Sequence, residues 1–329
     1  MTLKGYGGFV VRKITASLII IFTMISTTFV LFRMMPGDPV KLMFNDPRLG
    51  KQDIELMYER FGLNGSLWEQ FVAYIRQLLL HGDLGMSFVQ LRPVMDVLAS
   101  RIPQTLLLML VAIILALLLG IWLGTMAGWR TGSKFDGAVI TGALTTYAIP
   151  SFCMGIILLL VFAVYLRIFP VGGYSTPVSG LTGFAYFIDV ARHLVLPSLS
   201  VALWYIGAYV LITRNSIIDV LDQDYITLAR AKGLKESVVI RKHGLRNALL
   251  PVTTATGMYL AYALGGAVQA EVVFAWPGLG LLLYEAILSR DYPVLQGAFL
   301  VMAIVIIGAN LVVDLVYGLL DPRIKVGGG

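Results

Sequence analysis

Charged residues are scarce in this sequence, and their scarcity restricts the class of protein. Only 13% of the 329 residues are charged and 58% are hydrophobic, whereas about a quarter of the residues in a soluble domain are charged. So large an apolar content exceeds what one core can bury, and it indicates a protein of the lipid bilayer. Cysteine is nearly absent too. With Cys153 alone, the chain can form no disulfide within itself.

The sequence also lacks the motifs of common nucleotide- and metal-dependent enzymes. It has no G-x-x-x-x-G-K-[ST] loop, so we expect the chain neither to bind nor to hydrolyse ATP. Its three histidines, His81, His193 and His243, fall in three separate loops and predict no metal site. An intramembrane enzyme would need a nucleophile paired with a base on its spans, and the apolar runs hold no histidine. We therefore predict no catalytic residue, metal or cofactor in this chain.

What the sequence does contain is six charge-free runs that are long enough to cross a bilayer as helices. A span needs roughly 20 apolar residues. The six runs are residues 14–32, 105–129, 137–166, 194–213, 247–270 and 292–313. The expected fold is therefore an all-α integral membrane protein with six transmembrane helices.

The basic residues are distributed unevenly between alternate connections. If the N-terminus is cytoplasmic, fourteen Lys and Arg fall on the inner side, and three (Arg167, Arg192 and Arg290) fall in the short outer loops. The positive-inside rule then predicts that both termini are cytoplasmic.

The long connection between the first two spans has helical signals of its own. Ser66 and Glu69 have the spacing of a capping box, and apolar residues recur behind them at helical intervals up to a stop at Gly82. A shorter helix is expected near residues 54–62. We interpret this connection as a small helical extracytoplasmic domain, which either packs on the membrane core or binds an external partner.

Small residues recur at helical spacing in two of the predicted spans. Such stripes let helix backbones approach closely in lipid, either within one chain or at a subunit interface. The residues are Ala116, Gly120, Gly124 and Gly128 in the second span, and Gly257, Ala261 and Gly265 in the fifth.

Three polar side chains fall at the depth of the predicted spans. Glu271 closes the fifth span, whereas Asn310 and Asp314 share one face of the sixth. Carboxylates in a bilayer are costly and usually face protein or water. Glu271, Asn310 and Asp314 are therefore candidates for a translocation pathway or gate. A structural contact to Arg or to the backbone is the alternative.

The most basic segment lies between the fourth and fifth spans. Residues 225–251 hold six Lys or Arg against one acid. We expect two short helices around Gly233, the first capped by Asp222 or Asp224. The second helix is expected over about residues 236–249, and it should end before Pro251.

Two interpretations fit this basic segment. Its charge is typical of a topological anchor that touches anionic lipid. The anchor does not explain the small residues Ala229 and Ala231 ahead of Gly233. Two alanines before a glycine turn make a narrow helix end, which favours insertion into a groove on another protein.

This segment begins with Tyr225-Ile-Thr-Leu-Ala-Arg-Ala-Lys-Gly233 and ends with His243-Gly-Leu-Arg-Asn-Ala-Leu-Leu-Pro251. Both ends resemble the cytoplasmic "EAA" loop of binding-protein-dependent ABC importer permeases. The resemblance is closest to B-type subunits of the dipeptide/oligopeptide/nickel branch. It extends over nearly the whole chain through Pro36-Gly-Asp-Pro39, Gly82-Asp-Leu-Gly85-Met-Ser87, Ile149-Pro-Ser-Phe152, Glu271-Val-Val-Phe274, Pro277-Gly-Leu-Gly280, Arg290-Asp-Tyr-Pro293 and Asp321-Pro-Arg-Ile324. The general loop pattern begins with Glu, where this chain has Thr227. The distance from glycine to proline is also longer than in the general pattern, as is normal for this branch.

The resemblance implies a type I ABC importer permease fold and a set of partners. These are a second homologous permease subunit, two ATP-binding cassette subunits that hold ATP and Mg²⁺, and an extracytoplasmic solute-binding protein. The loop would couple the permease to the ATPase subunits. The residues implied in that coupling are Tyr225, Thr227, Ala229, Arg230, Ala231, Lys232 and Gly233.

The resemblance also implies transport of di- or oligopeptides across the plasma (inner) membrane of a prokaryote. A nickel chelate or an oligosaccharide is the alternative substrate, and an ion-gradient-driven secondary transporter is the alternative class of protein. The expected organisation has four parts. They are the N-terminus with the first span (1–35), an extracytoplasmic loop domain (36–103), a transmembrane core (104–321) that includes the coupling loop 214–250, and a cytoplasmic tail (322–329).

Overall fold

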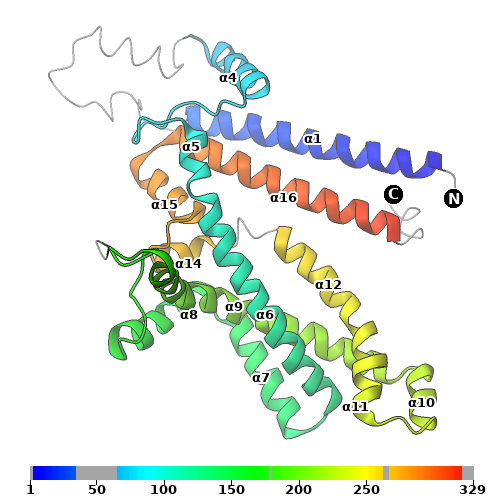
Figure 1. Ribbon diagram of the computed structural model, residues 1–329. Helices are drawn as coiled ribbons and strands as arrows, with labels where there is room; N and C mark the ends of the chain where they lie inside the picture. The colour runs from blue at the N-terminus through cyan, green and yellow to red at the C-terminus, as the bar shows by residue number, and fades with distance from the viewer. Residues whose placement is uncertain (1–2, 35–64, 178–179, 262–266, 321–329) are drawn as a thin grey trace. The chain divides into compact units, whose positions relative to one another are not determined.

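The chain folds into helices that divide between two compact units (Figure 1). The computed structural model describes residues 3–34, 65–177, 180–261 and 267–320, and within those ranges it contains helices but no β-strand. One unit comprises residues 1–103 and 278–329, and the other comprises residues 104–277. The expected boundaries of the extracytoplasmic domain, the transmembrane core and the tail stay predictions.

The first unit is built on two long helices from opposite ends of the chain. α1 (Leu3–Met34) and α16 (Tyr292–Leu320) lie side by side, and the ring of Phe32 stacks on Tyr292 and on Phe299, with centroid distances of 6.1 and 6.2 Å. α15 (Leu279–Ser289) and α5 (Val94–Ala99) pack against α16. The first and the last described helices of the chain therefore form one apolar pair.

α4 (Leu67–His81) is the helix predicted in the outer connection, and its ends are as expected. Ser66 and Glu69 form a capping box, and Gly82 ends the helix at φ 64°. Phe71 packs edge-on against Phe29 of α1 at 5.2 Å, which joins α4 to the membrane helix pair. The apolar side chains of Trp68 and Leu79 stay exposed. The shorter helix expected near residues 54–62 lies outside the described residues.

The second unit is organised around α9 (Gly183–Leu221), its longest helix. α7 (Lys134–Ala148), α8 (Ser151–Leu158), α12 (Leu245–Ala261) and α14 (Val268–Val273) all contact α9. α8 continues into the π-helix η1 (Leu159–Tyr165). The apolar core of this unit forms between α6 (Ile102–Trp129), α9 and the start of α14.

The glycine stripe of the second span packs within the chain. A Cβ on Gly120 would collide with the Cβ of Tyr209, and one on Gly128 would come within 2.8 Å of the carbonyl of Arg214. The backbones of α6 and α9 thus touch where glycines leave room. Of the second stripe, Gly257 lies half-buried in α12. The side chain of Ala261 and the whole of Gly265 lie outside the described residues.

Four of the six expected spans are confirmed as long apolar helices, three of them longer than expected. They are Val10–Met34, Val94–Trp129, Gly183–Leu221 and Tyr292–Val312. The fifth expected span, 247–270, corresponds to α12 and α14, with residues 262–266 between them outside the described part.

The third expected span, 137–166, corresponds to a bent pair of helices. α7 and α8 meet at an angle of 102°. Pro150 has no N–H to continue the helix of α7, and it restricts the residue before it to extended backbone. Ile149 accordingly has φ −78° and ψ 125°. The third span is therefore a broken helix.

Candidate functional site

The basic loop contains the left-handed turn that the sequence predicts. α10 (Asp224–Ala231) has Lys232 as its C-cap, and Gly233 follows with φ +73°. The N–H of Gly233 donates to the carbonyl of Arg230 at 2.9 Å. A Cβ at Gly233 would have no atom within 4 Å. Glycine is therefore required by the backbone conformation and not by crowding. A left-handed conformation costs other residues roughly 1–2 kcal/mol.

Both expected ends of the loop helices need correction. α9 continues to Leu221, so Asp222 ends that helix and Asp224 is already the first residue of α10; Gln223 lies at the cap without a side-chain cap bond. The second helix does not stop before Pro251.

Instead, three segments continue one another beyond the glycine turn. They are α11 (Glu236–Val238), the π-helix η2 (Val239–Gly244) and α12, which runs through Pro251. A proline inside a helix removes one backbone bond, and a membrane helix tolerates that loss where neighbouring groups compensate. The loop is thus continuous with the fifth span.

Two side-chain contacts fix α10 at its two ends. The guanidinium of Arg230 donates to both carboxylate oxygens of Glu236, at 2.7 and 3.2 Å, across the glycine turn. At the other end, Nδ2 of Asn247 in α12 donates to the hydroxyl of Tyr225 at 2.8 Å. The hydrogen bond from Arg230 lowers the pKa of the Glu236 carboxyl. These contacts hold α10 against both segments that follow it.

The loop helix buries one face and exposes another. Ile226 and Ala229 are buried and pack with Val239 against the end of α9. The side chain of Ala229 therefore packs against its own chain. Its part in a contact with a partner stays a prediction. Thr227, Arg230 and Gly233 are exposed.

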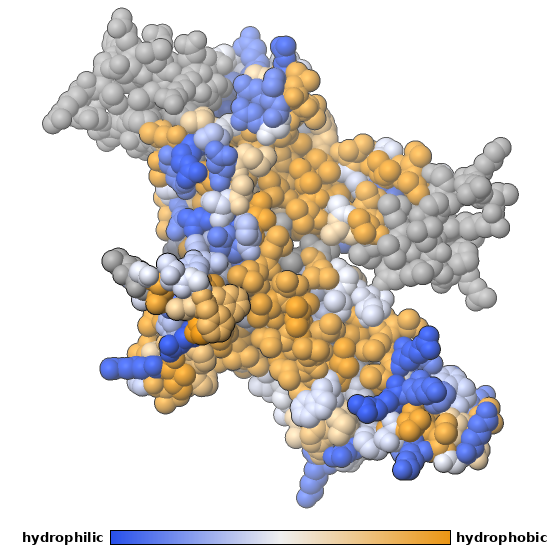
Figure 2. Space-filling model, viewed as in Figure 1, coloured by the Kyte–Doolittle hydropathy of each residue, from blue (hydrophilic) through white to orange (hydrophobic). Residues whose placement is uncertain are grey.

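Five further exposed residues of α10 and its turn form one mixed surface, which we call the α10 surface. It consists of Tyr225, Leu228, Ala231, Lys232 and Leu234. In Figure 2, hydrophilic side chains gather over α10 and α11, with hydrophobic ones between them. Apolar side chains exposed on a basic, water-facing loop indicate a binding surface for another protein.

Glu271, a candidate for the pathway, is engaged inside the second unit. Its side chain is fully buried, and its Oε1 accepts a hydrogen bond from Thr105 Oγ1 at 2.6 Å. Nearby, Nε1 of Trp276 donates to the carbonyl of Gln104 at 3.0 Å. Glu271 therefore joins α14 to the start of α6 through a threonine hydroxyl. Its role in a pathway or gate stays a prediction.

The other two pathway candidates lie in the first unit. Asn310 is half-buried in α16. The backbone of Asp314 lies in the same helix, and its side chain is outside the described part. Their role in a pathway or gate stays a prediction.

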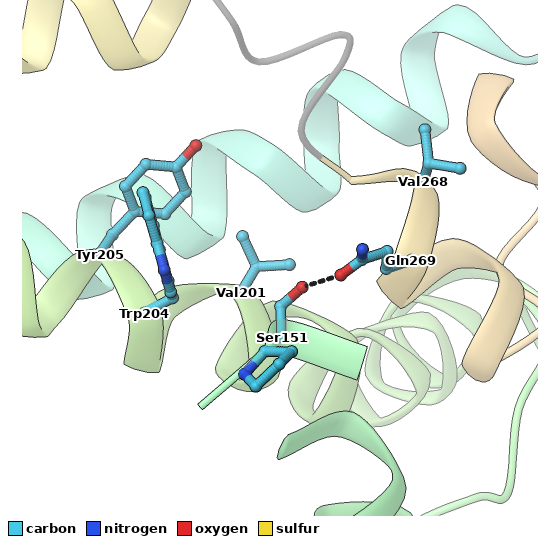
Figure 3. Close-up of a pocket in the computed structure, with 7 residues that line it drawn as sticks. Ser151, Val201, Trp204, Tyr205, Val268 and Gln269 are labelled. Carbon is cyan, nitrogen blue, oxygen red and sulfur yellow. Dashed lines mark hydrogen bonds between the residues drawn. The ribbon is translucent and has the colours of Figure 1, made fainter. Parts of the chain in front are cut away.

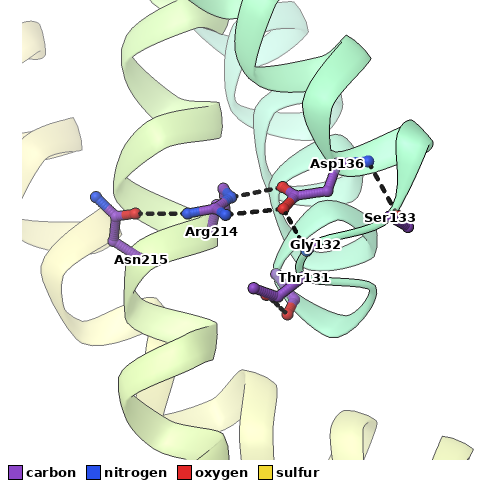
Figure 4. A network of polar contacts seen from close by, with 7 residues as sticks. Thr131, Gly132, Ser133, Asp136, Arg214 and Asn215 are labelled. Carbon is purple, nitrogen blue, oxygen red and sulfur yellow. Dashed lines mark hydrogen bonds and ion pairs between the residues drawn. The ribbon is translucent and has the colours of Figure 1, made fainter.

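Sequence reasoning missed an ion pair between α7 and α9 (Figure 4). The guanidinium of Arg214 donates to both carboxylate oxygens of Asp136, at 2.6 and 2.8 Å. The N–H of Gly132 donates to Asp136 as well, and the hydroxyl of Ser133 caps α7. The spacing of Ser133 and Asp136 is a cap signal that could have placed the carboxylate at the start of a helix. Arg214, which is 78 residues away, gave no such signal.

Comparison with known proteins shows matches over nearly the whole chain. Residues 116–326 match the family described as binding-protein-dependent transport system inner membrane component, and residues 7–109 match the N-terminal family of the same membrane components. The chain is 40% identical over 320 residues to the oligopeptide transport system permease protein AppB of Bacillus subtilis (strain 168), covering 96% of this chain and 99% of that protein.

Two further relatives and one solved structure agree. The dipeptide transport system permease protein DppB of Escherichia coli (strain K12) is 37% identical over 315 residues, covering 91% of this chain and 93% of its own. The glutathione transport system permease protein GsiC of the same strain is 36% identical over 318 residues, covering 96% and 98%. The MetNI methionine ABC transporter superposes with a TM-score of 0.54 at 16% identity, over 69% of this chain and 97% of its own. That likeness supports the fold.

Proposed function

Because this chain belongs to the family of binding-protein-dependent transport system inner membrane components, we propose that it forms half of the translocation pathway of an importer for di- and oligopeptides. Members of this family are permease subunits of ABC importers, so the chain is an integral membrane protein and not an enzyme. It works with ATPase and binding-protein partners. The peptide substrate is proposed because AppB and DppB are named as oligopeptide and dipeptide permeases, and GsiC as a glutathione permease.

The observation that supports a coupling role is the α10 surface. It presents Leu228 and Lys232 outward from a helix that is fixed by Arg230–Glu236 at one end and by Tyr225–Asn247 at the other. A surface held in this way transmits a displacement by a partner into α12 through Tyr225 and Asn247. It transmits the displacement into the end of α9 through the packed side chain of Ile226. The partner would be an ATPase subunit.

The full assembly we propose contains this chain, a second homologous permease, two ATP-binding cassette subunits and an external solute-binding protein. ATP and Mg²⁺ bind to the cassette subunits and not to this chain, which has no phosphate-binding loop. The complex resides in the plasma (inner) membrane of a prokaryote. Both termini and the α10 surface face the cytoplasm, as the distribution of Lys and Arg supports.

The test of this function replaces Leu228 by Glu in the co-expressed complex. A carboxylate on the apolar part of the α10 surface should weaken the contact, so that less ATPase co-purifies and peptide uptake into proteoliposomes falls. The matched control is Thr227→Glu, which adds the same charge to the same helix at the place where the general family pattern has Glu. We expect the control to transport at nearly the wild-type rate. If Leu228→Glu retains its ATPase and its uptake, the α10 surface is not the coupling contact.

A further inference from the structure

We infer that the break between α7 and α8 forms a subsite on the translocation pathway that binds the backbone amide groups of short peptides. This inference rests on the proposed function. The pocket at the break encloses about 540 Å³, within the range of roughly 300–1,000 Å³ that is usual for ligand sites. Beside Pro150 at the break, it is lined by Ser151, Val201, Trp204, Tyr205, Val268 and Gln269 (Figure 3).

The pocket lies where the third span is interrupted. Pro150 and Ser151, at the 102° bend, both line it. Irregular backbone within a membrane segment is tolerated where it is buried in protein or lines a water-filled cavity. Pro150 is exposed here and borders the pocket. The interruption is thus expected to face an aqueous space and not lipid.

The polar groups of the pocket come from two different helices. Ser151 begins α8, and its Oγ donates to Oε1 of Gln269 in α14 at 2.6 Å. Together, the hydroxyl and the carboxamide offer both donors and acceptors. A peptide bond presents one N–H and one C=O, so it requires a site of both kinds. Figure 3 shows this pair between the aromatic side chains of α9 and Val268.

An aromatic wall completes the pocket on the side of α9. The Trp204 ring stacks on Tyr147 at 5.0 Å, and Tyr205 packs edge-on against Tyr259 at 4.8 Å. Rings fixed by their neighbours form a rigid apolar surface that suits side chains of many shapes. Among the described residues, none of those that line the pocket carries a charged side chain. Such a site binds the backbone that all peptides share and does not select for a particular side chain.

The first test measures peptide uptake by the complete complex in proteoliposomes. Gln269→Leu keeps the approximate shape of the side chain and removes its hydrogen bonds. We expect uptake of a tripeptide to fall about tenfold, which corresponds to one or two lost hydrogen bonds, while the co-purified ATPase stays unchanged. Ser151→Ala should act in the same direction. The control, Thr253→Val, removes an exposed hydroxyl of α12 that bonds its own helix, and should transport normally.

A second measurement separates a contact with the peptide from a merely structural role. A tripeptide methylated on its amide nitrogens lacks the backbone donors. We expect the wild-type complex to import the unmethylated peptide faster than the methylated one, and Gln269→Leu to import both at similar rates. If the variant keeps the full wild-type preference, Gln269 does not contact the backbone and the inference is wrong.

The third test asks whether peptide reaches the pocket. In a Cys153→Ser background, Ser151→Cys should react with a thiol-reactive tripeptide, and dipeptides with different side chains should protect it. Ile157→Cys, on an exposed part of α8, is the control and should not be protected. If the cysteine at position 151 stays unlabelled, or is labelled without protection, peptide does not occupy the pocket and the inference fails. If the wild-type complex imports no peptide at all, the proposed function fails instead.

Discussion

Gly124 of α6 lies directly against Thr213 of α9. A Cβ on the glycine would come within 2.7 Å of the threonine Cβ and within 2.8 Å of the Val210 carbonyl. One neighbour is a backbone carbonyl oxygen and the other is a Cβ, so neither can be moved aside by rotation of a side chain. The spacing of α6 and α9 is therefore set by the absence of a side chain at this position.

The first prediction is that Gly124→Ala destabilises the protein. The added methyl must push α6 away from α9, and overpacking of this kind typically costs about 1–3 kcal/mol. The melting temperature of the purified protein in detergent should fall. Gly142→Ala is the control, because no atom lies within 4 Å of a Cβ at that helical position. It should leave the melting temperature unchanged or raise it slightly. Equal melting temperatures for both variants would contradict the close contact of α6 and α9.

The second prediction is that Gly233→Val impairs coupling more than folding. Valine at φ +73° strains the backbone by roughly 1–2 kcal/mol and misdirects the α10 surface. The variant should insert and pair with its partner permease on blue-native gels. Less ATPase should co-purify, and uptake should fall sharply.

The control for this variant is Gly82→Val, which places the same strain at φ 64° in the cap of α4, also with no atom within 4 Å of the new Cβ. We expect Gly82→Val to keep its ATPase. If Gly233→Val assembles and transports at the wild-type rate, the basic loop is only a topological anchor.

The third prediction concerns acid. The folded pKa of Glu236 lies below its usual value, so the pair with Arg230 stabilises the turn above about pH 4.3, the ordinary Glu value. This contribution is lost as the pH falls through the folded pKa. Both side chains are more than a third exposed, so it should not exceed about 1 kcal/mol.

Hydrogen exchange of residues 230–236, corrected for the intrinsic rate, should show protection decreasing below that pH in the wild type. Arg230→Gln should show lower protection at neutral pH and no further acid step. An identical acid profile in the two proteins would exclude the ion pair as the cause.

The fourth prediction concerns the ion pair of α7 and α9. The side chains of Asp136 and Arg214 are only 4% and 17% exposed. Asp136→Ala leaves the guanidinium without its carboxylate, which costs about 3–5 kcal/mol for a buried pair. The double variant Asp136→Leu with Arg214→Met removes both charges and should recover much of the lost stability in a thermal unfolding measurement. If the double variant is less stable than Asp136→Ala alone, the pair stabilises through more than mutual charge compensation.

The fifth prediction tests orientation. In a Cys153→Ser background, Ser66→Cys should react with a membrane-impermeant thiol reagent in intact cells, and Ser237→Cys should react only after the cells are permeabilised. Both positions are exposed in their loops, so each is accessible from its own side of the membrane. The opposite labelling pattern would reverse the proposed topology.

The prolines show why the sequence predicts the positions of the spans better than it predicts whether each span is one continuous helix. Charge-free length is a property of the chain alone, and four spans could be located from it. The expected third, fourth and fifth spans each contain a proline, and the three prolines have different outcomes. Pro150 lies at a 102° break, whereas Pro197 and Pro251 lie inside continuous helices. Whether a proline breaks a helix depends on the groups packed around it, and those come from other parts of the chain.

In the candidate site too, features that depend on neighbouring residues could be predicted, and features that depend on distant residues could not. The capping box at Ser66 and the turn at Gly233 depend on a few neighbouring residues, and both could be predicted. The burial of Ala229 could not, because an alanine fits equally well against its own chain or in a partner's groove. The pairing of Asp136 with Arg214 depends on how α7 and α9 pack, which no local pattern contains.

The glycine contacts of α6 also determine how the second unit can move. Gly120, Gly124 and Gly128 seat α6 on α9 over more than two turns. Sliding one helix along the other would drive each glycine against the next bulky residue, so the two helices must tilt together. α9 leads into α10 after only Asp222 and Gln223. A displacement of the loop therefore moves α9 and α6 together as one rigid pair. The size of the resulting movement depends on the length of this pair and not on bending within it.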